Sequence, residues 1–206
     1  MMHDEPSADT LERLERAEQL KLAGKHAEAL AILEELLFED PENVSALEEI
    51  ADNELSLNQY ARAEAAAMQA SKLDDESYTG YYILGFLRSR SEDWKEAVTY
   101  LRKANALKSN NAEILRCLGW ALFHEGERAQ GIVTLERALN LDADSTLTLC
   151  DLGVGYLQVQ NFSKAKILFE RAIDLDPDNA RARECLQAVE RLKKFAPAEK
   201  QAQKIA

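Results

Sequence analysis

A spacing of 34 residues recurs along most of this chain and constrains its fold more than any other feature. Counting back from Gly153 in steps of 34 residues reaches only small residues, which are Gly119, Gly85, Ala51 and Ala17. Counting back from Ala165 in the same steps reaches Gly131, Ala97, Ala63 and Ala29. A register that holds without insertion or deletion across so many copies indicates an internal repeat.

Each repeat has room for two helices joined by a short turn. The chain has only 8 Gly and 4 Pro, so long helices are favoured over a many-stranded sheet. Paired helices approach closely only where the contacting side chains are small, which explains the recurring Gly and Ala. The repeats are residues 10–43, 44–77, 78–111, 112–145 and 146–179.

The segments outside the repeats are expected to differ from them. Residues 180–194 predict one more helix, in which Gln187 and Glu190 stand where true repeats have small and aromatic residues. A further helix pair would bury these two side chains, so we expect a capping helix with a solvated outer face. We expect a mobile tail over residues 195–206 and a disordered start over residues 1–9.

Two local expectations concern the helix ends and interiors. Asp9 is a candidate N-cap for the first helix, because a side-chain oxygen there can accept a backbone N–H of the first turn. Gly131 stands where the other repeats have Ala, at a cost of roughly 1 kcal/mol inside a helix. The second helix of the fourth repeat is therefore expected to be the least stable.

The last repeat combines small, aromatic and aliphatic residues with a closing proline, at Leu152, Gly153, Tyr156, Ala165, Phe169, Ala172 and Pro177. In these residues it resembles the tetratricopeptide repeat (TPR) family. The resemblance covers about residues 10–194, although no repeat has the Trp that the family often carries at the fourth position. It implies an all-α fold, a right-handed solenoid of antiparallel helix pairs with the first helices on the concave side, and a protein-binding scaffold. The sequence contains no phosphate-binding loop or nucleophile motif, so we expect no catalytic residues, metal or cofactor.

Charge and hydropathy exclude several classes of partner. The formal net charge is −12, and residues 1–77 alone carry −14. Such an acidic surface repels phosphate backbones, so nucleic acid is not an expected partner. The chain has no run of 18 apolar residues and no signal-peptide pattern at its start. We therefore expect a cytoplasmic protein, of bacterial type, with no membrane partner.

The family resemblance places certain first-helix positions on the concave side, and these divide into two zones. We expect a peptide or protein partner whose apolar anchors contact the first zone, because Trp, Tyr and Arg are enriched at binding hot spots. Basic residues of the partner would meet the second zone. The apolar and aromatic zone comprises Tyr82, Ile83, Phe86, Arg90, Arg116, Trp120, Phe123 and Val154. The acidic zone comprises Glu15, Glu18, Glu48, Glu49 and Asp52.

Plainer interpretations of the same residues stay open at this point. Phe123 and Trp120 can be core residues packed between neighbouring helices. The acidic zone can be a solvated face that keeps the protein in solution. The aromatic zone can be covered by the chain's own tail or by a second copy, which would make the protein a homo-oligomer.

The preferred function is a scaffold or adaptor that binds a peptide segment. A second hypothesis is a chaperone that shields apolar segments of an exported or assembling client, and a third is a self-assembling structural protein. An enzyme or metal site would have to use Cys117, Cys150, Cys185 and His124, but their spacing contains no C-x-x-C pair. Small apolar filler is the better interpretation of these cysteines.

Overall fold

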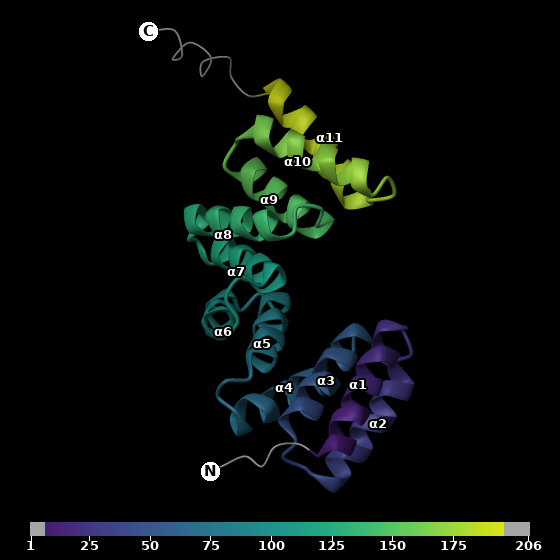
Figure 1. The fold of residues 1–206 in the computed structure, drawn as a ribbon. Coiled ribbons are helices and arrows are strands. Elements are labelled where there is room, and N and C mark those ends of the chain that lie inside the picture. The colour runs from purple at the N-terminus through teal and green to yellow at the C-terminus, as the bar shows by residue number, and fades with distance from the viewer. Residues whose placement is uncertain (1–6, 196–206) are drawn as a thin grey trace. The chain divides into compact units, whose positions relative to one another are not determined.

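The computed structural model describes residues 7–195, and within them it contains eleven helices and no strand (Figure 1). The expected all-α fold is confirmed. The helices of the first three repeats are α1 (Ala8–Leu22), α2 (His26–Glu39), α3 (Val44–Ser56), α4 (Tyr60–Leu73), α5 (Tyr78–Arg90) and α6 (Trp94–Leu107). The remaining helices are α7 (Ala112–Glu125), α8 (Arg128–Leu141), α9 (Thr146–Gln158), α10 (Phe162–Leu175) and α11 (Ala180–Phe195).

A polar side chain caps the start of each first helix from α3 onward. Asn43, Ser77, Asn111 and Ser145 each accept the backbone N–H three residues later. Asn179 does the same for α11, at 2.9 Å from the N–H of Ala182. A cap of this kind satisfies a backbone donor that the helix leaves without a partner. The caps therefore fix where each repeat begins.

Helix α1 is capped in the same way but begins earlier than the sequence predicts. Ser7 is its N-cap, and the Ser7 hydroxyl accepts the N–H of Thr10 at 3.1 Å. Asp9 lies in the first turn instead, where its charge suits the helix dipole and its carboxylate lies 3.5 Å from Arg13. Residues 8 and 9 are helical, which corrects the expectation of disorder there. The rest of the predicted disordered start and mobile tail, residues 1–6 and 196–206, lies outside the described residues.

The turn inside each repeat reverses the chain through one residue in the left-handed conformation. This residue follows the C-cap of the first helix or is itself the cap. Glycine fits such a position without strain, and the non-glycine residues there each carry a small backbone cost. The residues and their φ angles are Gly24 (73°), Asn58 (59°), Glu92 (62°), Gly126 (116°) and Gln160 (61°).

The chain divides into two compact units, residues 1–109 and residues 110–206. In the first unit α1 packs against α3 and α3 against α5; in the second, α7 packs against α9 and α9 against α11. Within the described residues, no two successive second helices approach each other as closely. The first helices therefore form the inner layer of each unit, α1, α3 and α5 in one and α7, α9 and α11 in the other.

Small residues at one position of the repeat set the distance between the two helices of a pair. A Cβ atom built on Gly85 would lie 2.6 Å from the side chain of Leu101. One on Gly153 would lie 2.6 Å from the ring of Phe169. In the first two repeats Ala17 and Ala51 take this place and are fully buried. In the last three repeats each pair thus closes on one large apolar side chain of its second helix.

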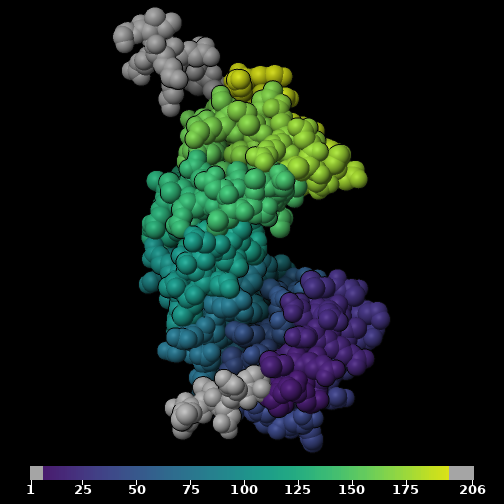
Figure 2. All heavy atoms as spheres, in the orientation of Figure 1, coloured from purple at the N-terminus to yellow at the C-terminus, as the bar shows by residue number. Residues whose placement is uncertain are grey.

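Helix α11 covers the end of the second unit, where it lies beside α10 (Figure 2). Its apolar face is anchored by Ala182 and Val189, which are buried in the clusters that α9 and α10 contribute to. Gln187 and Glu190 are exposed on α11. An apolar inner face and a polar outer face are what a helix needs to end a solenoid.

The close approach of α7 and α8 gives Gly131 a packing role in addition to its expected cost in helix propensity. A Cβ at this position would lie 2.7 Å from both the carbonyl oxygen of Gly119 and the backbone nitrogen of Phe123. These are backbone atoms, which cannot rotate out of the way as the end of a side chain does. Gly131 is therefore the residue that lets α8 reach α7, and Ala would not fit there without moving a helix.

A pair of glycine substitutions tests this point. Gly131→Ala should lower the free energy of unfolding by roughly 1–3 kcal/mol, because overpacking outweighs the gain in helix propensity. Gly155→Ala in α9 is the matched control, since its Cβ would lie 3.5 Å or more from Ile132 and Phe123, at ordinary contact distance. This second variant should be stabilised by up to about 1 kcal/mol. Urea unfolding of both variants measures the difference, and a stabilised Gly131→Ala would contradict the close-approach explanation.

Candidate functional site

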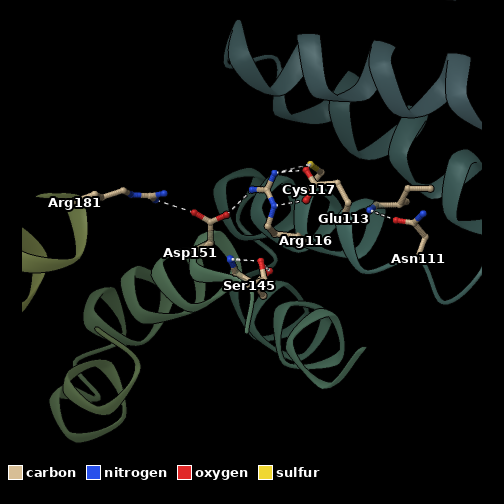
Figure 3. A network of polar contacts seen from close by, with 9 residues as sticks. Asn111, Glu113, Arg116, Cys117, Ser145, Asp151 and Arg181 are labelled. Carbon is tan, nitrogen blue, oxygen red and sulfur yellow. Dashed lines mark hydrogen bonds and ion pairs between the residues drawn. The ribbon is translucent and has the colours of Figure 1, made fainter. Parts of the chain in front are cut away.

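A chain of charged contacts crosses the inner layer of the second unit (Figure 3). Arg116 of α7 donates from Nη1 to Oδ2 of Asp151 on α9, at 2.7 Å. Arg181 of α11 donates from Nη2 to Oδ1 of the same carboxylate, at 2.8 Å. One acid on the middle helix is therefore shared by cations from the two neighbouring helices, and it ties all three together.

Arg116 is also held by an acid on its own helix. Glu113 accepts from Arg116 at both carboxylate oxygens, with distances of 2.9 Å from Nε and 2.5 Å from Nη2. Burial by itself would lower the pKa of Arg116, but the hydrogen bond to Glu113 and the nearby negative charges outweigh it and raise that pKa. Arg116 thus stays charged, and a two-point contact of this type fixes the plane of its guanidinium.

Trp120 lies beside this network on α7 and is partly exposed. Its ring centre is 4.3 Å from that of His124 one turn later, with 58° between the ring planes. The guanidinium carbon of Arg181 lies 5.6 Å from the Trp120 ring centre. The second unit therefore presents an indole next to a carboxylate whose cations come from two different helices.

The three cysteines of the chain are free thiols held in neutral form. Burial raises the pKa of Cys150 to about 11, and it also raises the pKa of Cys185. The pKa of Cys117 is raised as well, by burial first and then by the charge of Glu113, in spite of the opposing charge of Arg116. No cluster of His, Cys, Asp and Glu within residues 7–195 has the arrangement of a metal site.

The predicted acidic zone lies in the inner layer of the first unit, where part of it is already neutralised. Lys21 of α1 donates to Glu49 at 2.8 Å and to Asp52 at 2.9 Å, both on α3. Burial would lower the pKa of Lys21, but these two hydrogen bonds outweigh it and raise that pKa. Glu15 and Glu18 are exposed on α1. The zone is therefore less acidic than its composition suggests.

Glu48 has a structural contact of its own. It accepts the hydroxyl of Ser77 at 2.6 Å, and Ser77 in turn caps α5 by accepting the N–H of Gly80. Desolvation by burial raises the pKa of Glu48, against the effect of the Ser77 hydrogen bond. This carboxylate therefore supports the start of α5 as well as facing the inner layer.

The predicted aromatic zone is split between the two units. In the first unit Ile83 is fully buried, whereas Tyr82 and Phe86 are partly exposed and their ring centres lie 6.5 Å apart. Arg90 turns toward α4, where its guanidinium carbon lies 4.1 Å from the ring centre of Tyr60. Ile83 therefore belongs to the core of this unit.

In the second unit the predicted residues also differ in their exposure. Phe123 is 2% exposed and is a core residue, which supports the plainer interpretation of it. Val154 is partly buried against the cluster that contains Leu152 and Phe169. Arg116 and Trp120 lie together beside Asp151, as described above.

Three members of the charged network, Glu113, Asp151 and Arg181, are absent from the predicted zones. The sequence does contain a signal for Asp151. Arg116 stands at the fifth position of its repeat and Asp151 at the sixth position of the next, so the two are 35 residues apart and carry opposite charges. In a stacked repeat such positions are neighbours, and a search for opposite charges between successive repeats would have found the pair.

The shifted thiol pKa values make a direct prediction about reactivity. With its pKa at about 11, only roughly a thousandth of Cys150 is thiolate at pH 8, and the thiolate is the reactive form. Alkylation of the folded protein at this pH should be far slower than in urea, and it should accelerate as the pH rises toward 11. Mass spectrometry of iodoacetamide-treated protein measures each site. Rapid labelling of the folded protein at neutral pH would favour the enzyme hypothesis instead.

Every helix within residues 7–195 is too short or too polar to span a membrane.

The tetratricopeptide repeat family matches the sequence twice, over residues 14–78 and over residues 147–179. A curated relative, anaphase-promoting complex subunit 3 of Schizosaccharomyces pombe, is 23% identical over 125 residues, which are 61% of this chain and 19% of the relative. The chain thus spans about a fifth of that protein.

Several solved structures share the fold. The crystal structure of YrrB, described as a TPR protein with an unusual peptide-binding site, is 23% identical with a TM-score of 0.64, covering 85% of this chain and 90% of YrrB. TTC0263 of Thermus thermophilus is 22% identical with a TM-score of 0.65, covering 87% and 97%. A chain of the Cut9–Hcn1 assembly of the anaphase-promoting complex is 20% identical with a TM-score of 0.77, covering 88% and 36%. The two family matches and the paired helices shared with these structures identify the chain as a tetratricopeptide repeat protein.

Proposed function

We propose that this protein is a non-enzymatic scaffold that binds a peptide segment of a partner protein on the inner layer of its second unit. The observation that carries the proposal is the partly exposed Trp120, whose ring centre lies 5.6 Å from the guanidinium carbon of Arg181, the residue that also binds the buried carboxylate of Asp151. A partly exposed indole offers a large contact area to a partner, and fixing its side chain on binding costs little conformational entropy. Residues of this kind dominate the binding energy of interfaces.

The surroundings of Trp120 suit a segment with both apolar and polar residues. Leu147 is 55% exposed on the neighbouring helix α9. Val154 is partly exposed about two turns later on the same side of α9. Arg116 and Glu113 satisfy each other, so they frame the surface without leaving a net charge on it. A partner would therefore place a flat or apolar side-chain surface against Trp120 and polar groups around it.

The first unit supplies a second, weaker candidate surface. Tyr82 and Phe86 are partly exposed on α5, and Glu15 and Glu18 are exposed on α1. This surface would suit basic residues near apolar ones. YrrB, which shares the fold, is described as having a peptide-binding site, and such a site in a protein of this fold is consistent with the proposal.

Self-association is the second candidate function, and the first repeat favours it. Phe38 on α2 is 91% exposed and Leu22 at the end of α1 is 79% exposed. Burial of both side chains against a second copy would remove apolar surface from water, which favours association. A second copy would bury them, so the state of association must be measured together with binding.

The scaffold proposal is tested by substituting Trp120. Peptides are first selected by display on the full chain, and their affinities are then measured by calorimetry. Trp120→Ala should weaken binding by about 2 kcal/mol, or roughly thirtyfold, if this residue is a hot spot. Ile167→Ala is the matched control, because Ile167 is 64% exposed on the second helix α10.

Circular dichroism must show that both variants are folded, and light scattering on the same samples reports the state of association. Equal affinities for wild type and a folded Trp120→Ala variant would rule out the second unit as the binding surface. Loss of affinity in Ile167→Ala alone would indicate that the partner binds the outer helices instead.

A further inference from the structure

The contact between Arg181 and Asp151 joins a firmly held group to a loosely held one. The side chain of Asp151 is 4% exposed, and its Oδ2 oxygen accepts a hydrogen bond from Arg116, whose side chain is 13% exposed. Arg181 is 46% exposed and reaches the other oxygen, Oδ1, from the first turn of α11. The two arginines therefore differ in burial, since Arg116 is mostly buried between the helices and Arg181 is largely exposed to solvent.

Two features make the hold of Arg181 weak. A cation in the first turn of a helix opposes the positive end of the helix dipole, and Arg181 is the second residue of α11. The guanidinium carbon lies 5.6 Å from the Trp120 ring centre, near the limit of about 6 Å for a cation–π contact. For comparison, Arg90 lies 4.1 Å from the ring centre of Tyr60 in the first unit. The distance between the Arg181 guanidinium and the indole is therefore longer than in a close cation–π contact.

The charges show what remains when Arg181 leaves. Glu113 and Asp151 carry two negative charges and Arg116 and Arg181 two positive ones, so the network is neutral as it stands (Figure 3). Without Arg181, one negative charge stays on a buried carboxylate whose Oδ1 has lost its donor, next to an indole face. A carboxylate beside an aromatic ring is a receptor for a cation, and a guanidinium fits it well because it is planar and donates along its edge.

We infer that Asp151 Oδ1 and Trp120 form a binding site for an arginine side chain of the partner, and that Arg181 occupies this site in the free protein. The inference rests on the proposed function and adds the chemistry of the partner to it. An incoming arginine replaces Arg181 on the same carboxylate oxygen and stacks more closely on the indole.

The inference is tested with a small probe, N-acetyl-arginine amide, and its neutral citrulline analogue. The chain has 2 Trp, so Trp94→Phe leaves Trp120 as the single indole reporter for fluorescence and for the indole N–H resonance. Arg181→Gln in this background removes the internal competitor and should tighten arginine binding by about tenfold, the sum expected for an exposed ion pair and a cation–π contact. The citrulline analogue should not bind in either protein.

Arg183→Gln is the matched control, because Arg183 is another exposed arginine in the same turn and its carboxylate contact is Asp178 at 3.7 Å. It should leave arginine binding unchanged. Arg181→Met, which keeps the apolar part of the side chain, serves if Arg181→Gln disturbs α11, and circular dichroism monitors the fold of each variant. Asp151→Asn added to the Arg181 variant should abolish the gain.

Equal arginine binding in wild type and the Arg181 variants, equal binding of citrulline, or no binding of the arginine probe to any of them would each overturn the inference. These outcomes are distinct from failure of the scaffold proposal. Selected peptides that depend on Trp120 but neither contain arginine nor gain affinity in Arg181→Gln contradict the arginine site alone. Selected peptides that ignore Trp120 contradict both.

Discussion

The close contact between the two helices of each repeat is the constraint on which the rest of the structure depends. At Gly85, Gly119 and Gly153 the space for a Cβ is already taken by a large side chain of the partner helix. Because this contact returns every 34 residues, the pairs within each unit share one geometry, and successive pairs of that unit stack in the same way. The stacking brings the first helices together in the inner layer. That layer is where side chains not needed for packing become available for other contacts.

The fold was predictable because it depends on residue size and periodicity, which a sequence displays directly. The first helices from α3 to α9 begin at the 34-residue spacing of the repeat, at Val44, Tyr78, Ala112 and Thr146. Differences from the expectation arose where a single contact adds to or overrides the pattern. Ser7 caps α1 two residues before the register would place the cap, and Gly131 is required by the backbone of α7 and not merely tolerated. Neither feature is visible without the neighbouring atoms.

The candidate site was predictable only in part, because the exposure of a side chain depends on its neighbours in the adjacent repeats. Trp120 and Arg116 were placed in the inner layer, but Ile83 and Phe123 are core residues whose size alone did not reveal their burial. The ion pairs between repeats were predicted less well than the exposure of the side chains. Lys21 neutralises part of the acidic zone, and Asp151 joins three helices through contacts with residues 30 and 35 positions away in sequence. Charge pairing between repeats therefore determines which charged side chains of the inner layer are already engaged within the chain.

The proposed function requires that the inner layer of the second unit, and not its outer helices, holds the partner. Hydrogen exchange of the full chain, with and without a selected peptide at saturating concentration, tests this requirement without any substitution. We expect slower exchange in α7, in α9 and at the start of α11, because binding there opposes local opening of these segments. Slower exchange confined to α8 and α10, with α7 and α9 unchanged, would contradict it.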